Sequence, residues 1–190
     1  MKKTLTIILA FALVIAMSVA GTVAYLTSQD SVTNTFTVGK VKITLDEAKV
    51  DANGAAVTPE ERVEANSYKL IPGHAYTKDP IIHVDASSEK CWLFVKVENG
   101  ISAIEDSENT IAAQLADNGW SAVTGADGVY AYKESVAGGT DVDVFGSFKI
   151  AGNAAVANYA DAKVVVTAYA VQADGFNTAA AAWTASGFVA

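Results

Sequence analysis

The feature that most constrains the fold is a series of short segments in which apolar and polar residues alternate, separated by turns rich in glycine, proline and asparagine. In the clearest segment, residues 91–98, every odd position from Cys91 to Val97 is apolar. A period of two residues is typical of a strand with one buried face. Because no helical segment recurs between the strands, the sequence predicts an all-β antiparallel sandwich with one or two short peripheral helices.

The other expected elements follow from the same reasoning. The apolar residues change face at Gly39, which indicates a β-bulge or bend in the first strand. Asn53-Gly54 predicts a short hairpin, and Pro72-Gly73 predicts a type II turn. Residues 163–172 are apolar on both faces, as in a central strand. Further strands are expected at residues 36–45, 68–71, 80–85, 129–134 and 141–150, and helices at residues 107–117 and 178–183.

The start of the chain differs in composition from the rest. Lys2-Lys3 is followed by an almost wholly apolar stretch at residues 5–20 and then by small residues. This order predicts a secretory signal peptide cut between Ala24 and Tyr25. An uncleaved anchor is the alternative, because residues 5–26 as a helix would reach about 33 Å and cross a bilayer. The predicted organisation is a signal peptide at residues 1–24, a flexible polar tether at residues 25–35 and a single β-sandwich domain at residues 36–190.

Charge and cysteine content exclude several classes of protein. The chain has 13 basic and 21 acidic residues, and loss of residues 1–24 would leave 11 basic residues and a net charge of about −10. Such acidity argues against binding to nucleic acid and against binding to anionic lipid. Cys91 is the only cysteine, so no internal disulfide can form. Its parity with Leu93 predicts a buried thiol, with a reactive thiol as the alternative.

Several segments together resemble one bacterial family. They are GTVAYLT at residues 21–27, FTVGKVKITLDEA at 36–48, LIPGHAYTKD at 70–79, CWLFVKVEN at 91–99 and AYAVQADGF at 168–176. These segments are similar to the TasA/camelysin-like family of exported bacterial proteins, whose signal peptides are removed by a SipW-type signal peptidase. The resemblance implies a jelly-roll-like sandwich that is secreted to the cell surface or the biofilm matrix. No cofactor is expected, because the sequence contains no catalytic constellation.

The resemblance also implies a mode of assembly. In the family's fibre-forming member, the N-terminal segment of one subunit completes the sheet of the next. Here the donated side chains would be Tyr25, Leu26, Val32 and Phe36. The alternative is an unstructured N-terminus released by cleavage. The expected function is therefore that of a non-enzymatic surface or matrix protein that self-associates or binds other surface proteins, with any contact to a membrane confined to an uncleaved leader.

Two surface features have both a functional and a structural explanation. Trp92 and Phe94 lie on the face of their strand opposite Cys91, where they would form an exposed surface for a partner or a sugar. Such a surface would suit a further alternative function, that of a monomeric surface-binding module. The alternative is that a helix or a loop covers them. Asp141 and Asp143 share a strand face and are either a carboxylate pair for calcium or acid–base work, or a solvated face.

The enzymatic alternative is a metal-dependent peptidase, which the camelysin branch of the family implies. A zinc-peptidase helix places two histidines four residues apart with a glutamate after the first. His74 and His83 are nine positions apart and neither is followed by glutamate. A site would have to combine them with Asp79 and Asp85, and the alternative is that all four are ordinary surface residues.

Overall fold

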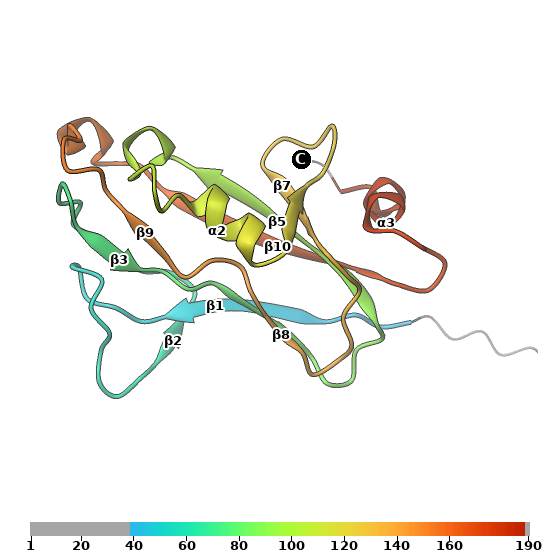
Figure 1. Cartoon of the computed structure of the whole chain (residues 1–190). Coiled ribbons are helices and arrows are strands. Elements are labelled where there is room, and N and C mark those ends of the chain that lie inside the picture. Colours follow the sequence, from blue (N-terminus) through green and yellow to red (C-terminus); the bar gives the residue numbers. More distant parts are fainter. Residues whose placement is uncertain (1–38, 189–190) are drawn as a thin grey trace, which may run out of the picture. The chain divides into compact units, whose positions relative to one another are not determined.

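Residues 39–188 are described by a computed structural model, and strands account for most of their regular structure (Figure 1). The predicted signal peptide, its cleavage site, the tether and the four donor residues lie outside the described residues. The strands are β1 (Ile43–Ala48), β2 (Arg62–Val63), β3 (Ala75–Thr77), β4 (Ile81–Val84), β5 (Cys91–Asn99), β6 (Trp120–Ala122), β7 (Val129–Tyr132), β8 (Asp141–Asp143), β9 (Ser147–Lys149) and β10 (Val164–Gln172).

The helices are short, and the prediction of an all-β fold is confirmed. Among residues 39–188, none of the helices is long and apolar enough to cross a bilayer. They comprise two 3-10 helices, η1 (Ser102–Ile104) and η2 (Val156–Tyr159), and two α-helices, α2 (Ile111–Asp117) and α3 (Ala179–Ser186).

The strands form two antiparallel layers. One layer contains the sheet β2-β1-β4-β8, and the other contains the sheet β10-β5-β7-β6. The pair β3-β9 extends the first layer, because Lys78 N–H donates to Gly146 O (3.3 Å) and Val144 N–H donates to Pro80 O (2.9 Å) between the two ladders. The result is a β-sandwich.

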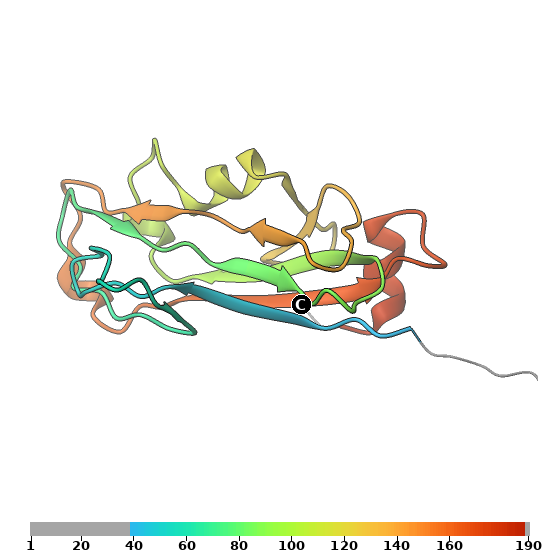
Figure 2. The same ribbon diagram turned by 90° about the horizontal axis from the view of Figure 1, so that it is seen from below.

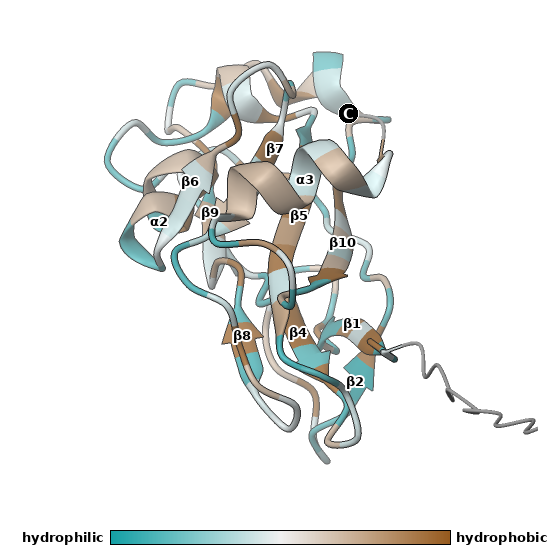
Figure 3. Cartoon of the chain, turned by 90° about the vertical axis from the view of Figure 1, so that its right-hand side faces the viewer, coloured by the Kyte–Doolittle hydropathy of each residue, from teal (hydrophilic) through white to brown (hydrophobic). Residues whose placement is uncertain are grey.

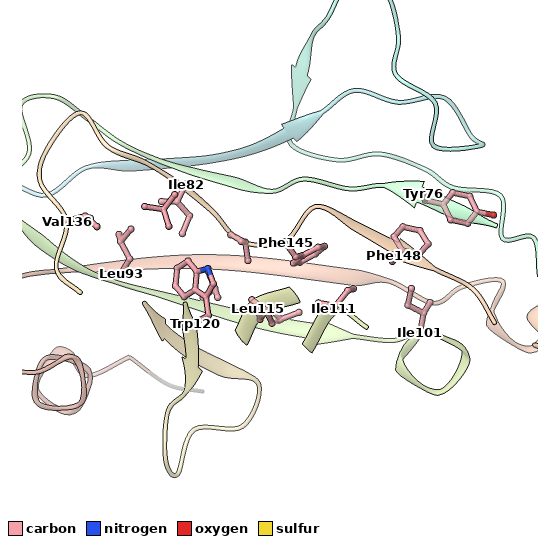
Figure 4. Packing of buried hydrophobic residues seen from close by; sticks show 14 of the residues in the cluster. Tyr76, Ile82, Leu93, Ile101, Ile111, Leu115, Trp120, Val136, Phe145 and Phe148 are labelled. Atoms are coloured by element: carbon pink, nitrogen blue, oxygen red, sulfur yellow. The ribbon is translucent and has the colours of Figure 1, made fainter. Parts of the chain in front are cut away.

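The core lies between these layers (Figure 4). In β5 the residues Cys91, Leu93 and Val95 are wholly buried, which confirms the face predicted from the alternation. Ile82 and Val84 face them from β4 and are also buried. Removing these side chains from water is the main stabilising contribution to such a fold.

Several local predictions are confirmed. Val50 pairs with Ala56 across the hairpin at Asn53-Gly54, where Gly54 has a positive φ of 77°. His74 N–H donates to Ile71 O (3.1 Å) across the Pro72-Gly73 turn. Helix α2 begins four residues later than predicted, after the capping residue Thr110, and buries both apolar residues that defined it. These residues are Ile111 and Leu115.

Two predicted strands are absent or shortened. Residues 39–42 are irregular, and Gly39 therefore lies outside any strand instead of forming a bulge. Residues 68–71 are also irregular, because the hydroxyl of Tyr76 takes the place of a partner strand. This hydroxyl accepts from Ile71 N–H (2.7 Å) and donates to Lys69 O (2.6 Å).

Two further predictions need correction. Residues 141–150 form two strands, because Val144 and Phe145 are consecutive and both buried, which breaks the alternation. Strand β10 lies at the edge of its sheet and not at the centre. Its two faces are apolar because one packs on the main core and the other lies under α3 (Figure 3).

Helix α2 and strand β6 join the two layers along one side of the sandwich. The side-chain carbonyl of Gln114 accepts from the N–H groups of Gly146 and Ser147 (both 3.1 Å), and its amide donates to Ser147 O (2.8 Å). Asn118 donates to Val144 O (3.1 Å), and the indole of Trp120 donates to Asp143 O (2.9 Å). Side chains thus provide hydrogen-bond partners for the backbone groups of residues 143–147, at positions where no further strand of the described chain is present.

Replacing Gln114 with alanine is expected to destabilise the protein by about 1–3 kcal/mol, because three hydrogen bonds are lost and two backbone N–H groups are left unpaired. The gain in helix propensity is smaller, about 0.4 kcal/mol. Urea unfolding checks this result. Gln114→Glu keeps the accepting oxygen and should cost less, whereas equal stability of Gln114→Ala and wild type would contradict the assignment.

Candidate functional site

Contacts between β1 and β10 close the opposite side of the sandwich only in part. Strands β1 and β10 run along the same side of the domain but belong to different sheets (Figures 1 and 2). A cleft of about 890 Å³ lies between them, and we call it the β1–β10 cleft. Its walls are residues 45–47 of β1 and 164–166 of β10, its mouth is formed by residues 64–68 and 159–163, and its floor includes Leu70, Lys78, Pro80, Ile101 and Phe148.

The β10 wall presents backbone groups toward this side. Val97 pairs with Val166, yet Val97 N–H donates to Gly128 O (2.8 Å) in the direction of β7. In an antiparallel ladder, both members of such a pair point away from each other. The backbone groups of Val166, and by alternation those of Val164 and Ala168, therefore face away from β5. Within residues 39–188 no strand pairs with them.

The β1 wall also presents backbone groups toward this side of the sandwich. Asp85 N–H donates to Lys42 O (3.0 Å), so Lys42 and the alternate residues after it face β4. Ile43 and Leu45 have the opposite parity, and their backbone groups point away from β4. Strand β2 pairs with β1 only from Glu47 onward. Short stretches of two strand edges, at Leu45 of β1 and at Val164 and Val166 of β10, therefore face the same cleft without a partner strand in the described chain. Such edges are templates for pairing with another chain.

The cleft is lined by both polar and apolar side chains. Leu45, Val164 and Val166 are half-buried and pack against the main core from the two walls. Tyr68 and Phe148 lie behind them, with ring centroids 5.1 Å apart and nearly perpendicular planes. An extended segment placed here would cover half-buried core residues with one face and pair its backbone with the walls.

A charged pair lies at the floor. Glu47 is 3% exposed, and its carboxylate forms an ion pair with Lys78. Asn66 donates to the second carboxylate oxygen (3.0 Å) and to Ala48 O (2.8 Å). Burial, with a smaller effect of Glu47, raises the pKa of Tyr68 far above its ordinary value, so this hydroxyl stays protonated. The buried charges are therefore compensated within the chain.

The cleft is closed at one end. Glu89 N–H donates to Lys40 O (3.0 Å) and Ala173 N–H donates to Lys90 O (2.7 Å), so the connection from β4 to β5 holds both walls. The side chain of Gln172 also lies against Gly39, where an added Cβ would be 2.2 Å from its amide oxygen. Strands β1 and β10 diverge toward residues 159–163 (Figure 1), and these residues are among those that line the cleft.

A second polar cluster lies on the outer face of the first sheet. Nδ1 of His83 is 2.7 Å from Asp141 Oδ1, and its Nε2 is 3.1 Å from Asp46 Oδ1. Arg62 pairs with Asp46 and, at 3.2 Å, with Asp79. Both ring nitrogens face carboxylates, and only the protonated imidazole donates from both. Burial lowers the pKa of His83, but the hydrogen bonds to Asp141 and Asp46 outweigh it and leave the pKa raised.

This cluster is expected to make stability depend on pH. Because the folded pKa of His83 exceeds the ordinary value of 6.5, its contribution is complete below pH 6.5 and is lost as pH rises through the folded value. Urea unfolding across this range should show declining stability. His83→Gln should flatten that decline; an unchanged slope in the variant would show that other groups cause it.

The residues of the hypothesised metal site are held apart by separate partners. Among residues 39–188, no group of three or more histidine, cysteine or acidic side chains is arranged to hold a metal ion. The partners are Asn53 O for His74 (2.8 Å), Arg62 for Asp79 (3.2 Å), Asp46 and Asp141 for His83, and Ser87 and Lys42 for Asp85.

The two aromatic residues of the hypothesised partner surface lie beneath other elements. Phe94 is wholly buried and its ring centroid is 5.1 Å from that of Trp183 in α3. Trp92 is half-buried and donates its indole N–H to Phe176 O (3.2 Å). Of the two sequence hypotheses, cover by a helix is the one found, and Phe94 is not part of an exposed surface. Cys91 is also buried, and this burial raises the pKa of its thiol to about 11.

Sequence reasoning did not find the β1–β10 cleft, because its walls are far apart in the chain, at residues 45–47 and 164–166, and only the strand order brings them together. The one local signal was the resemblance at residues 70–79, which contain the floor residues Leu70 and Lys78. Comparison of the chain with known protein families, with curated proteins and with solved structures found no match.

Proposed function

We propose that this protein is a non-enzymatic structural subunit of the bacterial cell surface or extracellular matrix, which assembles by accepting an extended strand from a second copy into the β1–β10 cleft. The observation that carries the proposal is the pair of strand edges that face one cleft. The resemblance to the TasA/camelysin-like family supports export and a SipW-type cut after Ala24. N-terminal sequencing of the secreted chain, with Tyr25 as the expected first residue, tests that part.

The energetic case rests on two contributions. An inserted strand gains main-chain hydrogen bonds from the walls, and its inward side chains gain contact with half-buried core residues. Gln114, Asn118 and Trp120 already close one side of the sandwich. Another strand can therefore complete the layers on the other side, at the β1–β10 cleft.

The proposed occupant is the segment at residues 25–37 of a second copy. It contains the four apolar side chains Tyr25, Leu26, Val32 and Phe36 and a single charged side chain, Asp30. Strand β10 has nine residues, which is about 30 Å of edge at 3.3 Å per residue, and its residues 164–166 line the cleft. The segment is longer than that edge, and its low charge avoids adding several carboxylates to a cleft that already contains the buried carboxylate of Glu47.

The test compares residues 25–190 with a chain that begins at Thr37, both imaged by electron microscopy and sized by sedimentation after concentration. Assembly is expected of the longer chain alone. A matched control keeps the length of the segment but replaces Tyr25, Leu26, Val32 and Phe36 with serine, and it should stay monomeric. If both natural chains remain monomeric, or if both assemble equally, strand donation by this segment is refuted.

A further inference from the structure

The buried charged pair at the floor of the β1–β10 cleft and its asparagine neighbour contain the groups of a self-modifying site. We propose that the side chains of Lys78 and Asn66 join in an isopeptide bond, with Glu47 as the acid–base residue. The bond is a covalent cross-link within one chain, and it does not depend on the assembly proposed above. It would close a ring over residues 66–78 and fasten the segment at residues 64–68 to the end of β3.

Three separate elements bring the reacting groups to one carboxylate. Glu47 belongs to β1, Lys78 directly follows β3, and Asn66 lies in the connection after β2. The ammonium of Lys78 forms an ion pair with Glu47 Oε2, and the amide nitrogen of Asn66 donates to Glu47 Oε1 (3.0 Å). The nucleophilic nitrogen and the leaving nitrogen are therefore held by the two oxygens of the same carboxylate. Such positioning is what a reaction between two side chains requires.

Hydrogen bonds also fix and polarise the amide of Asn66. Its Nδ2 donates to Ala48 O (2.8 Å) as well as to Glu47, and its Oδ1 accepts from Val50 N–H (3.0 Å). Negative charge develops on Oδ1 when an amine adds to Cγ, and the Val50 N–H is in place to stabilise this charge, as in an oxyanion hole. The contacts on both ends of the amide hold it in one orientation.

The surroundings keep water away from the reacting groups. The side chains of Glu47 and Lys78 are 5% and 11% exposed. Tyr68 lies beside them, because its hydroxyl donates to Thr77 O (3.0 Å) and because burial, followed by the charge of Glu47, raises its pKa. Burial disfavours the ion pair relative to a neutral amine and a neutral acid. The neutral amine is the nucleophilic form of a lysine.

The reaction balances without any further reagent. A proton moves from the Lys78 ammonium to Glu47, and the free amine Nζ adds to Cγ of Asn66. Glu47 gives this proton to Nδ2 and takes another from Nζ. The Cγ–Nδ2 bond then breaks, and its electron pair leaves with ammonia while the carbonyl re-forms. Glu47 ends as the neutral acid, so no unpaired charge is left in the buried site.

A purely structural role accounts less well for this arrangement. A buried ion pair generally contributes no more to stability than well-packed apolar residues of similar volume. The cross-link removes both charges of the pair and adds a permanent connection to a part of the chain that has no ladder. Residues 64–71, which contain Asn66, form no strand.

Mass spectrometry of the chain of residues 25–190, incubated at neutral pH, tests the bond. The reacted chain is expected to be lighter by one molecule of ammonia. Trypsin cuts after lysine and arginine, so the unreacted chain gives the separate peptides 63–69, 70–78 and 79–90. The reacted chain gives residues 63–69 joined to residues 70–90, because the modified Lys78 is no longer cut. The unreacted form, which keeps its full mass, is the one to which the energetics of the ion pair apply.

Two matched variants locate the reaction, and circular dichroism checks that each is folded. Lys78→Arg keeps a positive charge beside Glu47 but has no nucleophilic amine, so it should keep its full mass. Glu47→Gln keeps both reacting groups but cannot relay protons, and it should react about 100-fold more slowly or less.

The joined peptide in the wild-type chain supports the proposal whether or not the variants fold. A wild-type chain that keeps its full mass and gives three separate peptides overturns it. Loss of ammonia that persists in Lys78→Arg also overturns it, because the loss then arises at another asparagine. A Glu47→Gln chain that reacts as fast as wild type overturns the role of Glu47.

Discussion

Replacing Lys78 with methionine is expected to lower the free energy of unfolding by about 3–5 kcal/mol, the range observed when one member of a buried ion pair is removed. Glu47 is 3% exposed, and its remaining partner would be the side-chain amide of Asn66. A carboxylate left with one neutral donor in this environment loses its counter-charge without regaining water. Urea unfolding followed by circular dichroism measures the loss.

The matched control is the double variant Glu47→Gln, Lys78→Met. The introduced glutamine is uncharged but keeps an oxygen that can accept from Asn66, so the double variant should recover much of the stability lost by Lys78→Met alone. If the double variant is less stable than the single variant, the loss comes from packing around the Lys78 stem and not from an uncompensated charge.

Replacing Phe94 with alanine is expected to cost about 3–5 kcal/mol, as for other fully buried aromatic residues. Phe94 is 0% exposed and packs against Trp183, so the variant leaves a cavity between β5 and α3. Thermal or urea unfolding checks the loss, and tryptophan fluorescence should report the change beside Trp183.

Val165 provides the control for this prediction. It lies on the adjacent strand but is 41% exposed, so Val165→Ala should change stability by no more than about 0.5 kcal/mol. A small cost for Phe94→Ala, comparable to that of Val165→Ala, would mean that α3 does not cover this face in solution. The exposed aromatic surface would then regain support as a partner site.

The two sides of the sandwich differ in how their strand edges are satisfied. On one side, Gln114 and Trp120 supply side-chain hydrogen bonds to the backbone of residues 143–147. On the other, β1 and β10 face a cleft, and the polar groups at its floor already have partners in the chain. These unpaired edges are the physical basis for the proposed assembly.

The sequence by itself determined the class of fold and the inner face of its main strand. Alternation from Cys91 to Val97 predicted the buried side of β5, and the glycine turns at Gly54 and Gly73 were predicted correctly because positive φ is a local property of glycine. The four-residue spacing of Ile111 and Leu115 predicted helix α2, and this signal was equally local.

Tertiary structure alone decided which elements are neighbours. The outer face of β5 was equally compatible with exposure and with cover, and the packing of α3 on Phe94 resolved it. Strand β10 is apolar on both faces although it lies at the edge of its sheet, because α3 covers part of its second face. The β1–β10 cleft follows from strand order, which depends on long-range packing between residues 45–47 and 164–166 and leaves no local pattern in either segment.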